Sequence, residues 1–264
     1  MQIISRKGSK YMLDRILLKR EAKEITRSAR VSAYRITFLY LVIINVLDLI
    51  NTYVSGSVVT NMQFYFPDLP VPQFFLSALE FPPTLVMFVS VLVALLLSVL
   101  SVGYTIYQLG VRAGREMDYS SLFDGFSFVG KVILLQIVIF IHVFLWSLLL
   151  VVPGIIAAYR YRFATYNLCE NPEISVMEAL GLSTRQTYGH KMDLFVLDLT
   201  FLGWNFLCTM TLGILSIWIM PYIVQTNLGY FQQIKQMKGL GWFPPQEDAD
   251  DGQFRGQDPF GPGV

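Results

Sequence analysis

Three charged residues stand inside long apolar stretches of this 264-residue chain. Arg160 and Arg162 interrupt the stretch 132–168 beside Tyr159, and Asp198 interrupts the stretch 194–231. A charge placed in a hydrocarbon environment costs about 2.5–3.5 kcal/mol, so such residues face a bundle interior or a wet cavity. We therefore predict that Asp198 pairs with Arg160 or Arg162 across a helix bundle, with Tyr159 next to the pair.

Two roles fit this constellation. As a functional site, it would bind an anionic substrate or a lipid headgroup. As a structural element, it would be an ion pair that fixes the register of two helices, since a buried pair specifies packing even where it adds little stability. The structural role is the one we favour.

Asp48 and His142 are further polar residues within apolar stretches. Asp48 lies between Asn45 and Asn51 at helical spacing. Either the three line a polar path, or Asn45 and Asp48 bond to neighbouring helices and Asn51 lies near the outer interface. His142 either relays protons or forms a hydrogen bond between helices. In both cases the helix-packing interpretation is favoured.

Catalytic templates are absent from the sequence. It contains no GxSxG, HExxH or Walker A motif, no dinucleotide fingerprint and no paired intramembrane aspartates, so we predict that the protein is not an enzyme and uses no cofactor or metal. Cys169 and Cys208 have no ligand spacing and are interpreted as small apolar residues. A net charge of +1 does not suggest a nucleic-acid partner.

The composition points to lipid as the solvent. The chain is 54% hydrophobic and only 15% charged, whereas soluble domains carry about 25% charged residues. About 20 apolar residues cross a hydrocarbon core of ~30 Å, and the runs 36–55 and 85–109 each meet that length.

Two further runs are too long for one spanning helix. At ~1.5 Å per residue, the stretches 132–168 and 194–231 would each reach ~56 Å. Each contains a breaker near its middle, Pro153-Gly154 in the first and Gly213 in the second. We therefore predict an all-α membrane protein with six transmembrane helices, the last four forming two tight helical hairpins. The predicted spans are 36–55, 85–109, 132–152, 155–170, 193–212 and 214–231.

The distribution of basic residues indicates which side of the membrane is cytoplasmic. Ten of the 20 Lys and Arg precede the first span, and the loop 56–84 has none. In the six-span arrangement 18 basic residues face the same side, which the positive-inside rule assigns to the cytoplasm. We expect a multi-pass membrane protein with both termini cytoplasmic.

The segments flanking the membrane domain 36–232 have distinct characters. Residues 1–35 are basic and predict an amphipathic cytoplasmic helix, which either lies on anionic lipid headgroups or anchors the topology. Ser175 and Glu178 form a capping-box pattern that begins a short helix. The tail 233–264 is rich in Gly, Pro, Asp and Gln and predicts disorder. The expected partners are membrane lipids with anionic headgroups and other membrane proteins.

Several stretches resemble one uncharacterised bacterial integral-membrane family, a domain of unknown function. They are LKREAKEITRSA (18–29), PGIIAAYRYRFATYNLCENPEISVMEAL (153–180), LFVLDLTFLGWNFL (194–207) and TLGILSIWIMPY (211–222), and the similarity is densest over 120–232. The resemblance implies a six-helix bacterial plasma-membrane protein. It supplies no activity, substrate or catalytic residue.

Two functions follow as hypotheses. The first is a non-enzymatic scaffold, assembly or regulatory protein of the envelope, suggested by the missing motifs and the basic cytoplasmic segments. The alternative is a small transporter for an anionic or amphipathic solute, suggested by the charged residues within spans and by a faint internal repeat of about 60 residues. A polar cavity reaching Arg160 and Asp198 would favour the transporter, and a closed bundle the scaffold.

Overall fold

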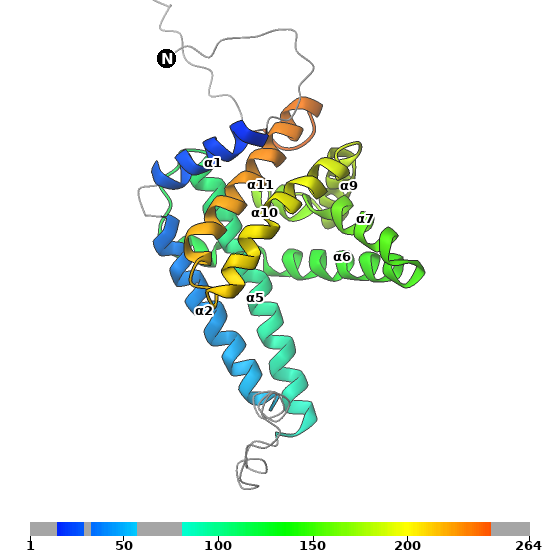
Figure 1. Ribbon diagram of the computed structural model, residues 1–264. Helices are drawn as coiled ribbons and strands as arrows, with labels where there is room; N and C mark the ends of the chain where they lie inside the picture. Colours follow the sequence, from blue (N-terminus) through cyan, green and yellow to red (C-terminus); the bar gives the residue numbers. More distant parts are fainter. Residues whose placement is uncertain (1–14, 29–32, 57–80, 244–264) are drawn as a thin grey trace, which may run out of the picture.

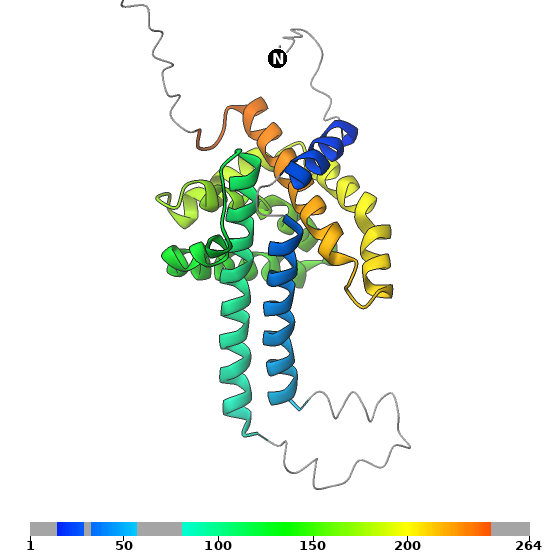
Figure 2. The same ribbon diagram turned by 90° about the vertical axis from the view of Figure 1, so that its left-hand side faces the viewer.

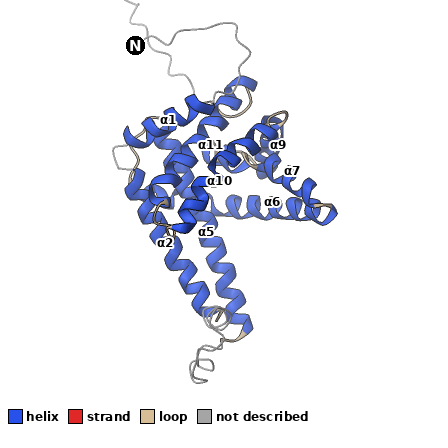
Figure 3. Cartoon of the chain, viewed as in Figure 1, coloured by secondary structure: helices blue, strands red, loops and turns tan. Residues whose placement is uncertain are grey.

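The computed structural model describes residues 15–28, 33–56 and 81–243, and all regular structure in these ranges is helical (Figure 3). The all-α prediction is therefore confirmed for the described part of the chain. The elements are α1 (Arg15–Ser28), α2 (Ala33–Val54), α5 (Pro83–Arg112), the 3₁₀ helix η1 (Tyr119–Phe128), α6 (Val129–Leu149), α7 (Val151–Tyr161), α8 (Ala164–Glu170), α9 (Val176–Thr187), α10 (Lys191–Met210) and α11 (Ser216–Lys238).

Four helical segments are long and apolar enough to cross a membrane. They are Ala33–Val54, Pro83–Arg112, Tyr119–Leu149 and Lys191–Met210. The chain is thus a membrane protein by composition and helix length, but the count of six spans is not confirmed. The predicted span 155–170 is divided between α7 and α8, because the helix is interrupted at Arg162 and Phe163. The predicted span 214–231 lies in α11, which buries polar side chains such as Gln225 and Thr226.

Helices α2 and α5 form a pair that extends beyond the rest of the molecule (Figures 1 and 2). Proline at the first position of α5 suits a helix start, because the amide that proline lacks would have no partner there. Near its other end the pair is fixed by Tyr104, whose ring stacks on Tyr40 at 4.5 Å and whose hydroxyl lies 2.8 Å from the Thr37 hydroxyl. The first half of α5 is largely exposed, and its buried residues gather from Val99 onward.

Helices η1, α6, α8 and α11 pack on α5, and α7, α9 and α10 pack on these helices. The 3₁₀ helix η1 lies against it so closely that a Cβ on Gly103 would stand 1.9 Å from the Leu122 carbonyl oxygen. Helix α11 supplies the centre of the neighbouring core through Tyr230, Phe231 and Ile234, all fully buried. Burial of these aromatic and aliphatic side chains holds α7–α8, α10 and α11 together.

The direction of α6 distinguishes it from α2 and α5. It begins directly after η1, beside the middle of α5, and runs crosswise to the α2–α5 pair rather than alongside it (Figures 1 and 2). The turn between α10 and α11 also stops well short of the far end of α2 and α5 in both views. The α2–α5 pair is therefore the part of the described chain that projects furthest.

The two long apolar runs are interrupted near, but not always at, the predicted breakers. The first break falls at Leu150, which has an extended backbone, and Pro153 and Gly154 lie inside the first turn of α7. Proline is tolerated there because first-turn amides have no helical partner. Gly154 is needed for close approach, since a Cβ would lie 2.1 Å from the Ser147 hydroxyl oxygen. The second break falls as predicted, with Leu212 and Gly213 at φ values of 51° and 83°.

The flanking segments differ from their predictions in extent. The basic helix predicted over 1–35 is present as α1, and residues 1–14 lie outside the described part of the chain. The tail was predicted to be disordered from residue 233, but α11 continues to Lys238 and ends at Gly239 in a left-handed cap. Residues 244–264 are outside the described part. The capping box is half present, since the Glu178 amide donates to the Ser175 hydroxyl at 3.2 Å.

Candidate functional site

The predicted ion pair is present and joins α7 to α10. Arg162 follows the last residue of α7, and Asp198 lies near the middle of α10. Arg162 donates from Nη2 to Asp198 Oδ1 at 2.7 Å and from Nη1 to Oδ2. Tyr159 donates its hydroxyl to Asp198 Oδ2 at 2.8 Å, and Asn227 on α11 accepts from Arg162 Nη2 at 3.2 Å. A bidentate guanidinium–carboxylate contact is a strong and directional one.

Arg160 does not join this cluster. Two residues apart on a helix lie on different faces, so Arg160 and Arg162 cannot both face Asp198. The Arg160 backbone carbonyl instead accepts hydrogen bonds from the hydroxyls of Ser183 and Thr187 on α9, at 2.8 and 3.2 Å. Its side chain is half-buried.

His142 and Asp48 also lie apart from the cluster. His142 Nδ1 is 2.8 Å from the Val138 carbonyl of its own helix, so the predicted bond between helices is wrong. Its ring makes an edge contact with Tyr161 at 5.5 Å. Asp48 is exposed on α2 and has no hydrogen bond or ion pair with the described residues. Of the six candidate residues, the structure brings together Tyr159, Arg162 and Asp198.

The polar groups of the ion pair bond mainly to one another. Both carboxylate oxygens of Asp198 accept hydrogen bonds, and both terminal nitrogens of Arg162 donate them. Other side chains line four of the cavities on the described part of the molecule. A pair bonded in this way fixes the position of α7 against α10 and α11.

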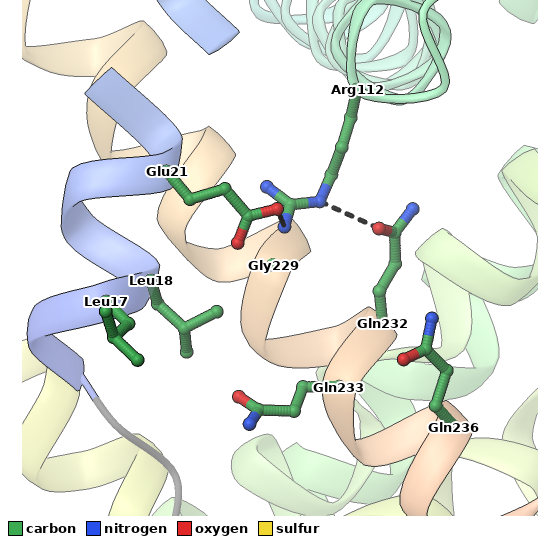
Figure 4. A pocket seen from close by; sticks show the side chains of 8 residues that line it. All are labelled: Leu17, Leu18, Glu21, Arg112, Gly229, Gln232, Gln233 and Gln236. Atoms are coloured by element: carbon green, nitrogen blue, oxygen red, sulfur yellow. Dashed lines mark hydrogen bonds and ion pairs between the residues drawn. The ribbon is translucent and has the colours of Figure 1, made fainter. Parts of the chain in front are cut away.

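A second polar cluster, at the end of α5, was not predicted. Arg112 donates from Nε to Gln232 Oε1 and from Nη2 to Glu21, both at 2.8 Å, and the guanidinium lies between α1, α5 and α11 (Figure 4). Its side chain is 5% exposed, although the sequence suggested only a topology-determining charge. A Cβ on Gly229 would lie 2.8 Å from Arg112 Nη2, so glycine leaves room for the guanidinium. The cluster borders a cavity of about 330 Å³.

One turn earlier on α5, Gln108 faces Gln225 of α11. Gln225 donates from Nε2 to the backbone oxygen and to the side-chain oxygen of Gln108, both at 2.8 Å. Both glutamines are fully buried. The sequence signal for this contact was present, since each glutamine interrupts an apolar run, but it was not used.

A third unpredicted contact joins α8 to α11. Lys235, 6% exposed, donates to both carboxylate oxygens of Glu170 at 2.8 and 2.6 Å, and its ammonium lies 5.2–5.4 Å from the ring centres of Phe231 and Phe243. Burial raises the pKa of Glu170, and the Lys235 ammonium opposes that shift. The pair borders a cavity of about 630 Å³. The Lys235 ammonium is balanced by the Glu170 carboxylate and by two aromatic rings. This contact therefore also holds α8 against α11.

The described residues also include potential metal ligands and thiols. No group of three or more His, Cys, Asp or Glu side chains there is arranged to hold a metal ion. Cys169 and Cys208 are both free thiols. The candidate sites are therefore a set of polar contacts between helices.

Comparison with known proteins agrees with the resemblance drawn from the sequence. Residues 147–238, which are 92 of the chain's 264 residues, match the model of a family described as "Protein of unknown function (DUF975)". The match begins near the end of α6 and ends with α11, and thus includes the Arg162–Asp198 pair. No curated protein and no solved structure matches the chain.

Proposed function

For a chain whose residues 147–238 are similar to a family of unknown function, we propose a non-enzymatic scaffold of the bacterial plasma membrane that inserts two helix pairs into one leaflet. The pairs are α6–α7 and α10–α11. Only α2 and α5 cross the bilayer in this proposal, and the termini and basic segments lie on the cytoplasmic side. The observation that carries it is the crosswise course of α6 from the middle of α5 (Figure 1).

The length of α5 indicates how deep in the bilayer the other helices lie. Its 30 residues reach ~45 Å, whereas a hydrocarbon core is ~30 Å thick. With Pro83 at the outer boundary, the inner boundary falls near Gly103. A Cβ on Gly125 of η1 would stand 2.6 Å from the Val99 carbonyl oxygen, so η1 lies at this inner boundary. Helix α6 starts there and runs across α5, which supports a position within the inner leaflet.

Exposed apolar side chains support the same position. In the α6–α7 pair they run almost without interruption from Phe140 to Ile156. In the α10–α11 pair they gather around the turn, where Met210, Leu212 and Ile214 are 63%, 93% and 63% exposed. Patches of this kind on a single chain mark contact with lipid or with other proteins. Because the α6–α7 and α10–α11 pairs would take up area in one leaflet only, they would expand that leaflet relative to the other.

Helix length argues against a complete crossing by α7. Helix α7 has 11 residues and reaches ~16 Å, about half of a hydrocarbon core. The six-span arrangement and the proposed one both keep 18 of 20 basic residues on one side, so the positive-inside rule is satisfied by either. The two arrangements differ in the position of the turns at Leu150 and Leu212, which the six-span arrangement would place outside.

The hydrogen bonding of the ion pair favours the scaffold over the transporter. A substrate path would need open polar space beside Arg162 and Asp198, whose hydrogen-bonding groups are instead occupied by each other, Tyr159 and Asn227. Reconstitution distinguishes the two functions. Expansion of one leaflet predicts that vesicles become smaller or tubular as the protein-to-lipid ratio rises, seen by electron cryomicroscopy. Unchanged vesicle shape together with protein-dependent flux of an anionic solute would refute the scaffold and favour the transporter.

A further inference from the structure

A basic and aromatic groove lies between α1, α10 and α11, away from the ion pair. Its volume is about 420 Å³. One wall carries the cationic side chains of Lys19, Arg20 and Lys23 from α1, and the opposite side carries the aromatic side chains of Trp204, Trp218 and Tyr222. Trp204 and Trp218 are 43% and 51% exposed, so their indole rings are accessible to a ligand.

The position of α1 follows from its own sequence. Leu18, Ala22 and Thr26 repeat every four residues and are buried on one face, which packs on α11 and the adjoining core. Lys19 and Lys23 are one position further along the helix, so they point over the groove instead. One face of α1 is therefore buried, and the adjacent face presents the charged side chains.

The groove combines two different environments. The Lys19 ammonium donates to the Thr200 hydroxyl at 2.8 Å and lies 4.7 Å from the ring centre of Phe201. Arg20 and Lys23 are exposed at the rim. Below them the tryptophan rings continue into the apolar surface around the α10–α11 turn. Cations above an apolar aromatic wall are typical of the boundary between headgroups and acyl chains.

We propose that this groove binds one anionic phospholipid molecule. Its phosphate lies among Lys19, Arg20 and Lys23, and an acyl chain lies along Trp204 and Trp218 towards the α10–α11 turn. Charge complementarity selects an anionic over a zwitterionic lipid, since a basic residue near an anionic surface favours binding about fivefold. The inference rests on the proposed one-leaflet insertion, because that position brings α1 and the middle of α10 to the headgroup level.

Tryptophan quenching by brominated lipids tests the site. The chain has four tryptophans, so Trp146→Phe/Trp242→Phe leaves only the two in the groove as reporters. The full chain is placed in phosphatidylcholine nanodiscs with a small fraction of dibrominated phosphatidylglycerol or, in parallel, dibrominated phosphatidylcholine. We expect the brominated anionic lipid to quench several-fold more strongly. The reciprocal variant, Trp204→Phe/Trp218→Phe, reports from outside the groove and should show no such preference.

Charge variants on α1 provide the matched control. Lys23→Gln should reduce the preference for phosphatidylglycerol, and Arg20→Gln/Lys23→Gln should remove most of it. Arg27→Gln removes one charge from an exposed position of the same helix outside the groove and should leave the preference unchanged. Equal quenching by both lipids, or equal losses in Lys23→Gln and Arg27→Gln, would refute the site.

Failure of the groove and failure of the proposed insertion are separable. Absence of lipid preference, with the turns at Leu150 and Leu212 still protected from an external reagent, refutes the groove alone. Labelling of those turns from outside refutes the one-leaflet insertion, whatever the quenching shows.

Discussion

The pair of Arg162 and Asp198 gives the sharpest stability prediction. Replacing Asp198 by alanine removes the acceptor of two guanidinium hydrogen bonds and one from the Tyr159 hydroxyl. It also leaves the Arg162 charge among helices without its counter-ion. We expect Asp198→Ala to destabilise the folded protein markedly, whereas Asp198→Asn, which retains acceptor and donor groups, should cost less.

The magnitude follows from burial. Breaking a fully buried ion pair by removing one partner costs about 3–5 kcal/mol. Here the side chains are 21% and 37% exposed, so water screens part of the loss and we expect about 2 kcal/mol. For a chain of this size that corresponds to a decrease in Tm of roughly 5 °C. Thermal unfolding of detergent-purified protein, followed by intrinsic fluorescence, measures this shift.

Two further variants separate structure from function. The charge swap Arg162→Asp/Asp198→Arg should recover at least half of the lost stability, because it restores the attraction between the same two helices. Asp48→Ala is the matched control, since that carboxylate is exposed and unpaired among the described residues, and it should change Tm by less than ~1 °C. A fully stable Asp198→Ala protein would refute the structural role and make ligand binding the better explanation of the pair.

Further substitutions test the packing of the bundle. Gly103→Ala should destabilise by at least about 2 kcal/mol, because its Cβ would overlap a backbone carbonyl of η1, and thermal unfolding measures the loss. Gly213→Ala should cost about 1 kcal/mol because alanine is strained at φ 83°, while Gly203→Ala, in a helix and with open space around it, should be neutral or slightly stabilising in the same assay. Glu21→Ala should loosen α1, because the carboxylate bonds Arg112, and hydrogen exchange of α1 amides should rise several-fold while α11 stays protected.

Part of this architecture follows from residue type and spacing. Asp198 and the two arginines were isolated charges in apolar runs, and the cost of leaving a charge unpaired in such surroundings requires that they meet. Which arginine makes the contact could not be predicted. That choice depends on α7 ending at Tyr161, which turns Arg162 rather than Arg160 towards α10.

Other features depend on contacts that a single sequence does not specify. Hydropathy gives the length of α6 but not its direction, which is set by η1 packing against Gly103. A glycine in a long apolar helix gives no sign that a carbonyl will lie against it. Pro153 suggested the break between α6 and α7, yet proline also fits a first helical turn, and the chain turns at Leu150. Arg112 was counted as a loop charge, although its position beside three glutamines of the bundle makes it a buried one.

Accessibility of the two helix turns tests the central claim, insertion of both helix pairs into the inner leaflet, most directly. In a Cys169→Ser/Cys208→Ser background, single cysteines at Leu150 and Leu212 are exposed to a membrane-impermeant maleimide on intact cells. Ser55→Cys, near the outer end of α2, is the positive control, and Tyr188→Cys, 77% exposed between α9 and α10, is the inner-side control. The proposed arrangement predicts labelling at position 55 and protection at 150, 188 and 212. Labelling of 150 and 212 at the rate of position 55 would contradict it and establish six complete spans.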